Sequence, residues 1–328
     1  MTRLYFTLRG DNEHLARGEL FALLEALGAS ISVECYTMIC ITSNVESTDL
    51  AERIMSRAGY LKEAGVLLGV FDAYSEDSAK SVASIIGKKG AHVSIFKSTV
   101  SNSAVKLFLE AGGLKQGVKR GEEYRLMFSS GLVFLGVKKY TVNSKLLEER
   151  ARIKPFKRSI ELTPDIARVL VNLSRANRGD IVLDPFAGTG VVLVEAWSMG
   201  IRAVGVDVDS ALVRGMRDNV LFFRANSVII HGDSSLLTYR EVDHVATDLP
   251  YGRAASTHGA EIKSLYRCFV EKLTEYLSRR GFAVFMTPHW LEDYIDEIIY
   301  EHGFRVTERY YNYVHSSLTR VINVVRWI

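Results

Sequence analysis

The chain changes its hydrophobic pattern near its middle. In the first half, helical spacing places five leucines on one face of a predicted helix over residues 14–27, which Gly28 ends: Leu15, Leu20, Leu23, Leu24 and Leu27. Apolar runs bounded by turn residues predict strands over residues 38–42, 66–71, 92–96, 125–128 and 132–140. Short elements of both kinds predict an α+β region.

The second half alternates strands and helices regularly. Apolar runs predict strands over residues 181–183, 203–206, 228–230, 245–247 and 282–286, with helical patterns between them. This order predicts an α/β fold with a doubly wound, mostly parallel sheet of seven strands. The last two strands, over residues 304–313 and 319–327, have no helix between them, which predicts an antiparallel strand at one edge.

These patterns divide the chain into three parts. We expect an N-terminal region over residues 1–144, a linker over residues 145–160 and a second domain over residues 161–328. The linker is charged and contains Pro155. The second domain opens with Thr163 and Pro164, a residue pair typical of a helix N-terminus.

Composition excludes several classes. No apolar run approaches the roughly 20 residues that cross a bilayer, so we expect a cytoplasmic protein that does not contact a membrane. The three cysteines, Cys35, Cys40 and Cys268, form no Cys-x-x-Cys pair. We therefore expect buried thiols rather than disulfides, and no metal site. A monomer is compatible with the sequence.

Positive charge is concentrated in one segment. Residues 115–158 carry 12 Lys and Arg against 4 Asp and Glu, whereas the flanking regions are mildly acidic. Such a segment is typical of a protein that binds a polyanion, although a solvated basic surface has the same pattern. The candidate RNA-binding residues are Lys115, Lys119, Arg120, Lys138, Lys139, Lys154, Lys157 and Arg158.

A glycine-containing loop follows the first strand of the second domain. Its residues are Asp184, Pro185, Phe186, Ala187, Gly188, Thr189 and Gly190. Glycines there let a ligand approach the backbone at the carboxyl end of a strand, where ligands bind in open α/β sheets. The dinucleotide fingerprint is incomplete, because Leu193 stands where its third glycine would be, and no Walker lysine follows. The ligand is therefore not expected to be a pyrophosphate.

Acidic residues end the next strands. Asp207 is placed to accept hydrogen bonds from a ribose diol, and Asp233 from an adenine amino group. Ribose and adenine without pyrophosphate describe an adenosyl ligand. After the fourth strand come Asp248, Leu249, Pro250 and Tyr251, a set that can hold a flat base by stacking and by accepting from its amine.

These motifs together resemble the Rossmann-like amino-methyltransferases, and most fully the archaeal tRNA guanine N2-methyltransferases that act at position 10. Further matches are Ile160–Pro164, Val171–Leu173, Asp248–Arg253 and His315–Arg320. Two departures are Leu249, where proline is common, and Ser159-Ile160, where His-Pro is common. The roles of His315 and Arg320 stay open between ordering the wall of the active site and contacting RNA.

The resemblance implies a function and its parts. The cofactor would be S-adenosylmethionine, held by the Asp184–Gly190 loop, Thr163, Asp207 and Asp233. The substrate would be guanosine in tRNA, converted to N2-methylguanosine or N2,N2-dimethylguanosine. Catalysis would fall to Asp248, Leu249, Pro250 and Tyr251. The N-terminal region would be a ferredoxin-like element and a THUMP domain that bind tRNA.

Other functions use similar motifs. A DNA adenine N6-methyltransferase or a protein glutamine methyltransferase commonly has Asn where this chain has Asp248. A non-catalytic RNA-binding protein would not need intact Asp184, Gly188, Gly190 and Asp207. The sequence therefore favours the RNA methyltransferase.

Overall fold

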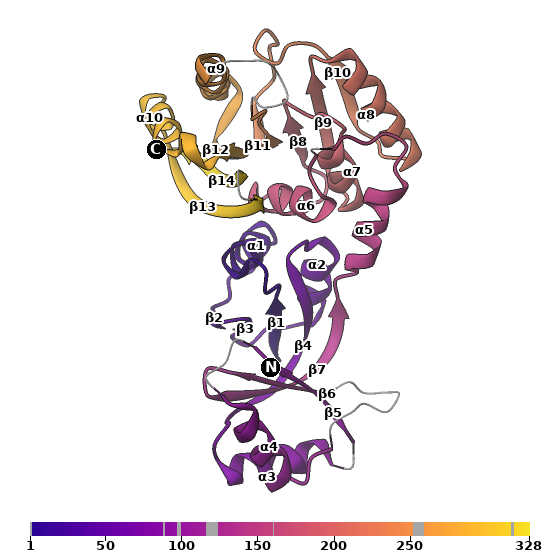
Figure 1. The fold of residues 1–328 in the computed structure, drawn as a ribbon, viewed down its shortest axis with the longest axis vertical. Helices are drawn as coiled ribbons and strands as arrows, with labels where there is room; N and C mark the ends of the chain where they lie inside the picture. The colour runs from indigo at the N-terminus through magenta and orange to yellow at the C-terminus, as the bar shows by residue number, and fades with distance from the viewer. Residues whose placement is uncertain are drawn as a thin grey trace. The chain divides into compact units, whose positions relative to one another are not determined.

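The computed structural model describes residues 2–87, 89–96, 100–115, 124–159, 161–251, 259–315 and 318–328. The chain forms two compact units, whose elements are labelled in Figure 1. The first comprises Met1–Arg17, Ala29–Ser56 and Tyr60–Val142. The second comprises Asn143–Ile328 together with Gly18–Gly28 and Arg57–Gly59. Each unit contains one sheet, and each is described by itself.

The first half of the first unit's sheet has the ferredoxin-like strand order. The strands run β4-β1-β3-β2, and each neighbouring pair is antiparallel. This is the order produced by a β-α-β-β-α-β chain, as predicted. The elements are β1 (Arg3–Leu8), α1 (Glu13–Ala26), β2 (Val33–Tyr36), β3 (Ile39–Thr42), α2 (Asp49–Arg57) and β4 (Leu61–Asp72).

The same sheet continues from β4 through β7 and β6 to β5. Within this half, β5 and β6 are parallel and the other pairs are antiparallel. Its core includes Val82, Phe108 and Phe128, and the two phenylalanine rings meet edge to face with centroids 5.6 Å apart. The elements are α3 (Glu76–Ile86), β5 (Ala91–Ile95), α4 (Asn102–Ala111), β6 (Tyr124–Ser129) and β7 (Leu132–Thr141).

The expectation of buried thiols is wrong for two of the three cysteines. Cys35 and Cys40 form a disulfide, and they lie directly opposite each other in the β2–β3 hairpin. The turn between the strands includes Thr37, whose φ is +52°. A spacing of five residues matches no Cys-x-x-Cys motif, and only the hairpin register brings the two sulfur atoms together.

The sheet of the second unit has the order β10-β9-β8-β11-β12-β14-β13. Its pairs from β10 to β12 are parallel, and β14 runs antiparallel to both of its neighbours, β12 and β13. The doubly wound sheet with one reversed strand is therefore confirmed, and the reversed strand lies one place in from the edge. The strands are β8 (Ile181–Asp184), β9 (Arg202–Asp207), β10 (Val228–His231), β11 (Val242–Asp248), β12 (Leu277–Pro288), β13 (Phe304–His315) and β14 (Leu318–Trp327).

Helices cover both faces of this sheet (Figure 1). One layer contains α6, α7 and α8, and the other contains α9 and α10. The core beneath α9 and α10 includes Tyr266, Phe269 and Phe285, with the last two rings 5.1 Å apart. The helices are α6 (Pro164–Leu173), α7 (Val191–Ser198), α8 (Ser210–Phe222), α9 (Gly259–Tyr276) and α10 (Glu292–Glu301). In the described ranges, we find no helix with the length and apolar character that a bilayer crossing needs.

The segment treated as a linker from its sequence contains a helix, α5 (Ser144–Ile153). Arg150 on this helix lies 3.0 Å from Glu195 of α7, and Arg168 of α6 lies 2.7 Å from the same carboxylate. Glu195 is 1% exposed. A buried carboxylate with two arginines therefore fastens α5 to the helices that precede and follow β8.

We expect Glu195→Leu to lower the free energy of unfolding by about 3–5 kcal/mol, because the buried Arg168 would lose its partner. Urea unfolding of the full chain measures the change. Glu149→Leu is the matched control, since its partner Arg152 and the glutamate itself are both mostly exposed. Equal losses in the two variants would contradict a special role for the buried cluster.

Candidate active site

Two neighbouring strands are joined where they end. Asp184 is the last residue of β8, and its carboxylate accepts a 2.6 Å hydrogen bond from the Thr247 hydroxyl of β11. The same oxygen accepts from the backbone N–H of Phe186 at 3.2 Å. Because both Asp184 and Thr247 are buried, this contact fixes the start of the glycine loop relative to the end of β11.

The carboxyl group of Asp184 has a pKa far above its ordinary value because it is buried. Burial raises its pKa to about 7, and the two hydrogen bonds act in the opposite direction. Asp207 and Asp248 also raise the pKa of Asp184 by charge repulsion. The structure therefore brings together three carboxyl groups that the sequence analysis selected separately, at the ends of β8, β9 and β11.

The glycine loop leaves room for a ligand. Gly188 and Gly190 have φ of +52° and +79°, values that residues with a side chain rarely adopt. No heavy atom lies within 4 Å of the position that a Cβ of Gly188 would take, so this part of the loop faces open space. Beneath the loop, Gly205 of β9 allows Leu193 and Ala187 to pack closely, since a Cβ there would lie within 3 Å of both side chains.

The acid that ends β9 is oriented by the loop. Asp207 accepts from the backbone N–H of Gly188 at 2.8 Å and from that of Asp209 at 2.9 Å. Burial raises its pKa, and these hydrogen bonds oppose the shift. Asp209 itself caps α8 by accepting from the N–H groups of Ala211 and Leu212, which gives it a structural role.

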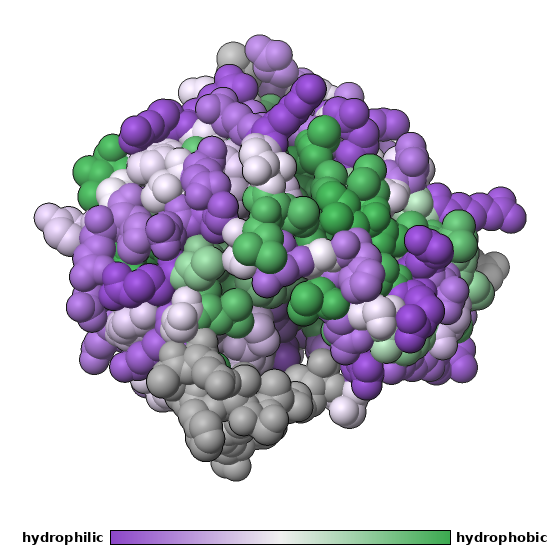
Figure 2. Space-filling view, turned by 90° about the horizontal axis from the view of Figure 1, so that it is seen from above, coloured by the Kyte–Doolittle hydropathy of each residue, from purple (hydrophilic) through white to green (hydrophobic). Residues whose placement is uncertain are grey.

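Asp233 lies two residues beyond the end of β10 and is exposed. Its carboxylate accepts from the backbone N–H of Ser235 at 2.9 Å and from its hydroxyl at 2.7 Å. Figure 2 shows apolar side chains gathered on the face of the molecule seen from above. Among the exposed apolar residues, Val208 and Leu236 closely follow Asp207 and Asp233 in the chain. An acid followed closely in the chain by an exposed apolar side chain suits a ligand with a flat ring and a polar edge.

The acid that ends β11 has two neighbours of different kinds. Asp248 accepts a hydrogen bond from the hydroxyl of Tyr251, and its Oδ2 lies 3.8 Å from Nη2 of Arg320. The guanidinium of Arg320 lies 5.3 Å from the centre of the Tyr251 ring. Burial raises the pKa of Asp248 to about 6, whereas Arg320 and Tyr251 lower it. Arg320 and Tyr251 thus favour the ionised carboxylate, which is the form that can act as an acceptor.

The residues between Asp248 and Tyr251 reach the site in different ways. Leu249 is fully buried in the core under α9, so only its backbone is available to a ligand. Pro250 is exposed, and its carbonyl accepts a 2.8 Å hydrogen bond from the hydroxyl of Tyr266 on α9. Tyr266 therefore anchors the turn from the neighbouring helix.

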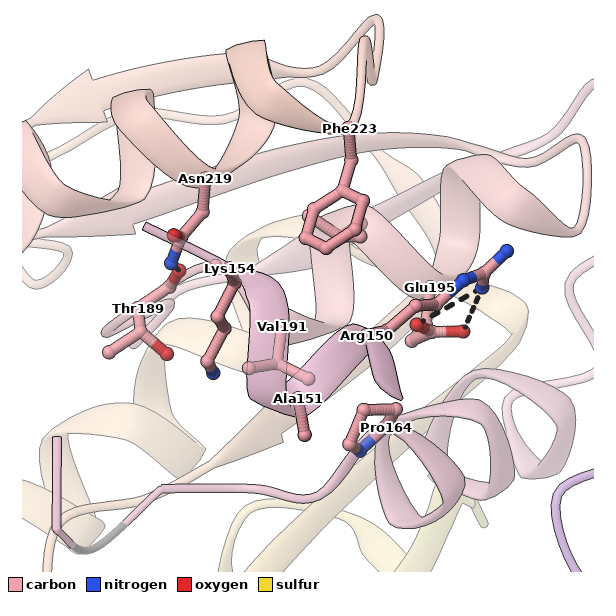
Figure 3. A pocket seen from close by; sticks show the side chains of 11 residues that line it. Arg150, Ala151, Lys154, Pro164, Thr189, Val191, Glu195, Asn219 and Phe223 are labelled. Carbon is pink, nitrogen blue, oxygen red and sulfur yellow. Dashed lines mark hydrogen bonds and ion pairs between the residues drawn. The ribbon is translucent and has the colours of Figure 1, made fainter. Parts of the chain in front are cut away.

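A small cavity lies on the helical side of the glycine loop, between α5, α6, α7 and α8 (Figure 3). Lys154, Thr189, Asn219 and Phe223 line it, with side chains that point inward from different elements (Figure 3). None of the three carboxyl groups lines it. We therefore interpret the cavity as a packing space behind the loop.

The loop is tied to the segment between α5 and α6. The Thr189 hydroxyl donates to Glu161 at 3.1 Å, and Lys154 forms a 2.8 Å ion pair with the same carboxylate. Asn219 of α8 donates to the carbonyl oxygens of both Thr189 and Phe156. Thr163, a predicted cofactor residue, stands at the N-cap of α6 without a capping hydrogen bond from its side chain.

The predicted RNA-binding residues have different outcomes. Lys154 is 5% exposed and paired with Glu161, so the prediction that it contacts phosphate is wrong. Lys115, Lys139, Lys157 and Arg158 are exposed, and Lys138 is half-buried. Lys119 and Arg120 lie outside the described residues.

Two side chains at the site, Thr247 and Tyr266, were not assigned from the sequence, and they hold Asp184 and Pro250. Arg320, whose role the sequence left open between the wall of the active site and RNA, lies beside Asp248. Thr247 directly precedes Asp248, so its place in the sequence could have indicated that it belongs to the site. Arg320 follows Asp248 by 72 positions, and only the pairing of β14 with β12 brings it near the end of β11. In the described parts of the chain, there is no group of three or more His, Cys, Asp or Glu side chains that could hold a metal ion.

The second unit of the chain is similar to known methyltransferases. Residues 151–322 match the family model UPF0020, described as RMKL-like, methyltransferase domain. The tRNA (guanine(10)-N2)-dimethyltransferase of Methanothermobacter thermautotrophicus is 40% identical over 182 residues, which are 54% of this chain and 53% of that protein. The alignment thus spans about half the length of that relative.

Other matches extend over the whole chain. The tRNA (guanine(10)-N2)-dimethyltransferase of Pyrococcus abyssi is 27% identical, with 98% of each chain covered. The crystal structure of TrmN from Thermus thermophilus is similar with a TM-score of 0.59 and 18% identity, and it covers 100% of both chains. At that identity the structural match shows the fold alone, which here includes both units.

We expect stability to fall less steeply with pH in Asp184→Asn than in the wild type. The unfolded carboxyl loses its proton near its ordinary pKa of 3.8, whereas the folded one keeps it up to about 7. The folded state therefore binds the extra proton in this window, and unfolding becomes easier as pH rises through it, by at most about 1.4 kcal/mol per pH unit. Asparagine keeps the acceptor for Thr247 and Phe186.

Urea unfolding at intervals from pH 4.5 to 7.5 measures this slope. Asp218→Asn, an exposed position on α8, is the control and should reproduce the wild-type slope. An Asp184→Asn curve parallel to the wild type would mean that the Asp184 carboxyl ionises normally.

Proposed function

We propose a function for this chain, which belongs to the UPF0020 family of RMKL-like methyltransferase domains: it transfers a methyl group from S-adenosylmethionine to N2 of guanosine in tRNA. The position would be 10, as in the names of the relatives, with N2-methylguanosine and then N2,N2-dimethylguanosine as products. The observation that carries the proposal is the position of Asp248, which ends β11 next to β8, the strand that leads into the glycine loop, with the Tyr251 hydroxyl and Arg320 beside its carboxyl group.

The cofactor suits the residues on this edge of the sheet. The open space at Gly188 admits a ligand that approaches the backbone, and Asp207 is oriented toward the loop by the N–H of Gly188. We assign the ribose hydroxyls to Asp207, the adenine amine to Asp233 and the methionine part to the Asp184–Gly190 loop. When bound, S-adenosylmethionine supplies an electrophilic methyl group on sulfur.

The residues after β11 would activate the amine. The exocyclic nitrogen of guanine is a weak nucleophile, because its lone pair is delocalised into the ring. Asp248 and the backbone carbonyl of Leu249 accept its two N–H groups, which orients the lone pair and stabilises the positive charge that develops on nitrogen. Since burial raises the pKa of Asp248 to about 6, this carboxylate can also take up the proton that the methylated nitrogen releases.

We assign the stacking of the base to the Tyr251 ring, one face of which is already covered. Arg320 lies over one face of the ring, so a base would stack on the other. Stacking of a base on an aromatic side chain contributes about 1–3 kcal/mol.

The first unit would supply much of the tRNA affinity. Exposed Lys115 and Lys139 belong to the basic segment and remain candidates for phosphate contacts. Binding through phosphates weakens as salt increases. We also propose a cytoplasmic location, which suits a tRNA substrate.

We expect Asp207→Ala to weaken S-adenosylmethionine binding by about 1.5–3 kcal/mol, the loss of a charge-assisted hydrogen bond to the ribose. Titration calorimetry on the full chain measures the affinity, and thermal melting shows whether the loop still folds. Asp218→Ala removes an exposed acid from the following helix as a control and should bind normally. Unchanged affinity in Asp207→Ala would remove the ribose assignment.

We expect the wild-type chain to methylate unmodified tRNA, and Asp248→Ala to lose more than nine tenths of the single-turnover rate. A tenfold loss corresponds to about 1.4 kcal/mol of transition-state stabilisation. Mass spectrometry of the digested nucleosides identifies the product and its methylation state. Cofactor and tRNA affinities should change little, because the carboxylate acts on the amine.

Asp293→Ala, an exposed acid on α10, is the control for this assay. Methylation of another base or of protein glutamine by the wild type would contradict the proposed substrate. An Asp248→Ala enzyme with more than a tenth of the wild-type rate would show that another group accepts from the amine.

A further inference from the structure

Arg320 occupies a buried place at the same edge of the sheet as Asp248. It is the third residue of β14, where it pairs with Pro288 at the end of β12 and with Asn312 of β13. Only 5% of the residue is exposed. An arginine is rarely buried unless its charge has a partner, so the contacts of this guanidinium are informative.

The guanidinium contacts the proposed catalytic residues. Nη2 lies 3.8 Å from Oδ2 of Asp248, and the planar group lies over the ring of Tyr251. Its Nε is buried and has no hydrogen-bond partner in the structure as described. Among the described residues, the side chain of Arg320 forms no hydrogen bond to another secondary structure element, and the groups that its guanidinium approaches are Asp248 and Tyr251.

Asp248 needs such a charge in order to act as an acceptor. Its carboxyl is buried, and the neighbouring Asp184 carboxyl repels it when both are ionised. Burial alone favours the protonated form, which would present a donor to the amine instead of an acceptor. Arginine keeps its positive charge at all relevant pH values, which makes it suited to hold the carboxylate.

We infer that Arg320 is a positioning residue of the methyl transfer, which holds Asp248 in its ionised form so that the carboxylate can accept from the target amine. The inference rests on the proposed function. Arg320 acts through Asp248, with its charge stabilising the carboxylate and its planar group supporting the Tyr251 ring. It adds to the catalytic set a residue from the reversed strand of the sheet.

The ionisation of Asp248 depends on groups from three elements and from the turn after β11. Arg320 of β14 lowers its pKa, and the hydroxyl of Tyr251 does so by donating. Asp184 of β8 couples to it by repulsion, and Tyr266 of α9 lies within electrostatic range. Because Asp184 and Asp248 titrate together, the informative quantity is the change between variants. Without Arg320, Asp248 would take up its proton at a higher pH. As the pH is lowered, the rate of methyl transfer would therefore begin to fall at a higher pH than in the wild type.

The test compares Arg320→Met, Arg320→Lys and the wild type in single-turnover methyl transfer to tRNA between pH 5 and 9. We expect the acid limb of the rate profile to move upward by about one pH unit in Arg320→Met, which lowers the rate about fivefold near pH 6 and about tenfold at the acid end of the range. The loss should shrink as pH rises. Arg320→Lys keeps the charge, so its limb should lie near that of the wild type.

Arg326→Met is the matched control. Arg326 is on the same strand, six residues away, or roughly 20 Å along β14, where it lies over the ring of Phe282. Its loss removes one positive charge without approaching Asp248, and its pH profile should match the wild type. A uniform loss of rate at every pH in Arg320→Met, or an acid limb in Arg326→Met that moves equally, would overturn the inference.

A second measurement does not depend on the reaction. Carbon-13 NMR of chains with labelled aspartate carboxyls follows the titration of Asp248, assigned from the signal missing in Asp248→Asn. We expect this titration to move to higher pH in Arg320→Met. An unmoved titration would overturn the inference even if tRNA is methylated as proposed. A moved titration in a chain that does not methylate guanosine would support the inference and contradict the proposed function.

Discussion

The hydrogen bond from Thr247 to Asp184 joins the two strands that carry the candidate site. It lies at the carboxyl ends of β8 and β11, which are neighbours in the sheet, and both residues are buried. One strand continues into the glycine loop and the other into the turn with Asp248. A shift of either strand would therefore separate the proposed cofactor-binding loop from the proposed acceptor of the amine.

This edge of the sheet concentrates negative charge in a poorly solvated place. Asp184, Asp207 and Asp248 each have a raised pKa, with burial as the largest cause. The three are compensated differently: Asp184 by a hydroxyl, Asp207 by backbone N–H groups and Asp248 by Arg320 and Tyr251. Such differences allow one carboxyl group to keep its proton at a pH where another is ionised. The proposed site needs this difference, because an ionised carboxylate has to accept from the amine.

Much of the fold could be predicted from the sequence, because periodicity and chain order determine it. The alternation of apolar runs specified the doubly wound sheet, and the last two strands specified its reversed member. The strand-end acids Asp184, Asp207 and Asp248 were identified because parallel strands end at one edge. Their contacts were not, since Thr247 donates to Asp184 and Arg320 approaches Asp248 across side-chain distances that no spacing encodes, and the sequence left the role of Arg320 open.

Two predictions failed for related reasons. Cys35 and Cys40 were expected to be separate thiols, because β2 is short and half-exposed and gave no strand signal. Lys154 was expected at an RNA surface, because a lysine in a charged segment has the same sequence pattern whether it is solvated or paired. Its partner Glu161 is seven residues away, in a stretch without regular structure, and only the folded chain shows the contact.

Asn219 has a consequence for how the site responds to ligands. Its amide binds the main chain of Phe156 on one side and the carbonyl of Thr189 on the other, so one side chain joins the segment between α5 and α6 to the glycine loop. A ligand that restrains the glycine loop would also restrain the segment between α5 and α6. Because such coupling is reciprocal, restraint of that segment would improve ligand binding at the loop by the same factor. A force on the segment between α5 and α6 would then change the affinity of the glycine loop for its ligand.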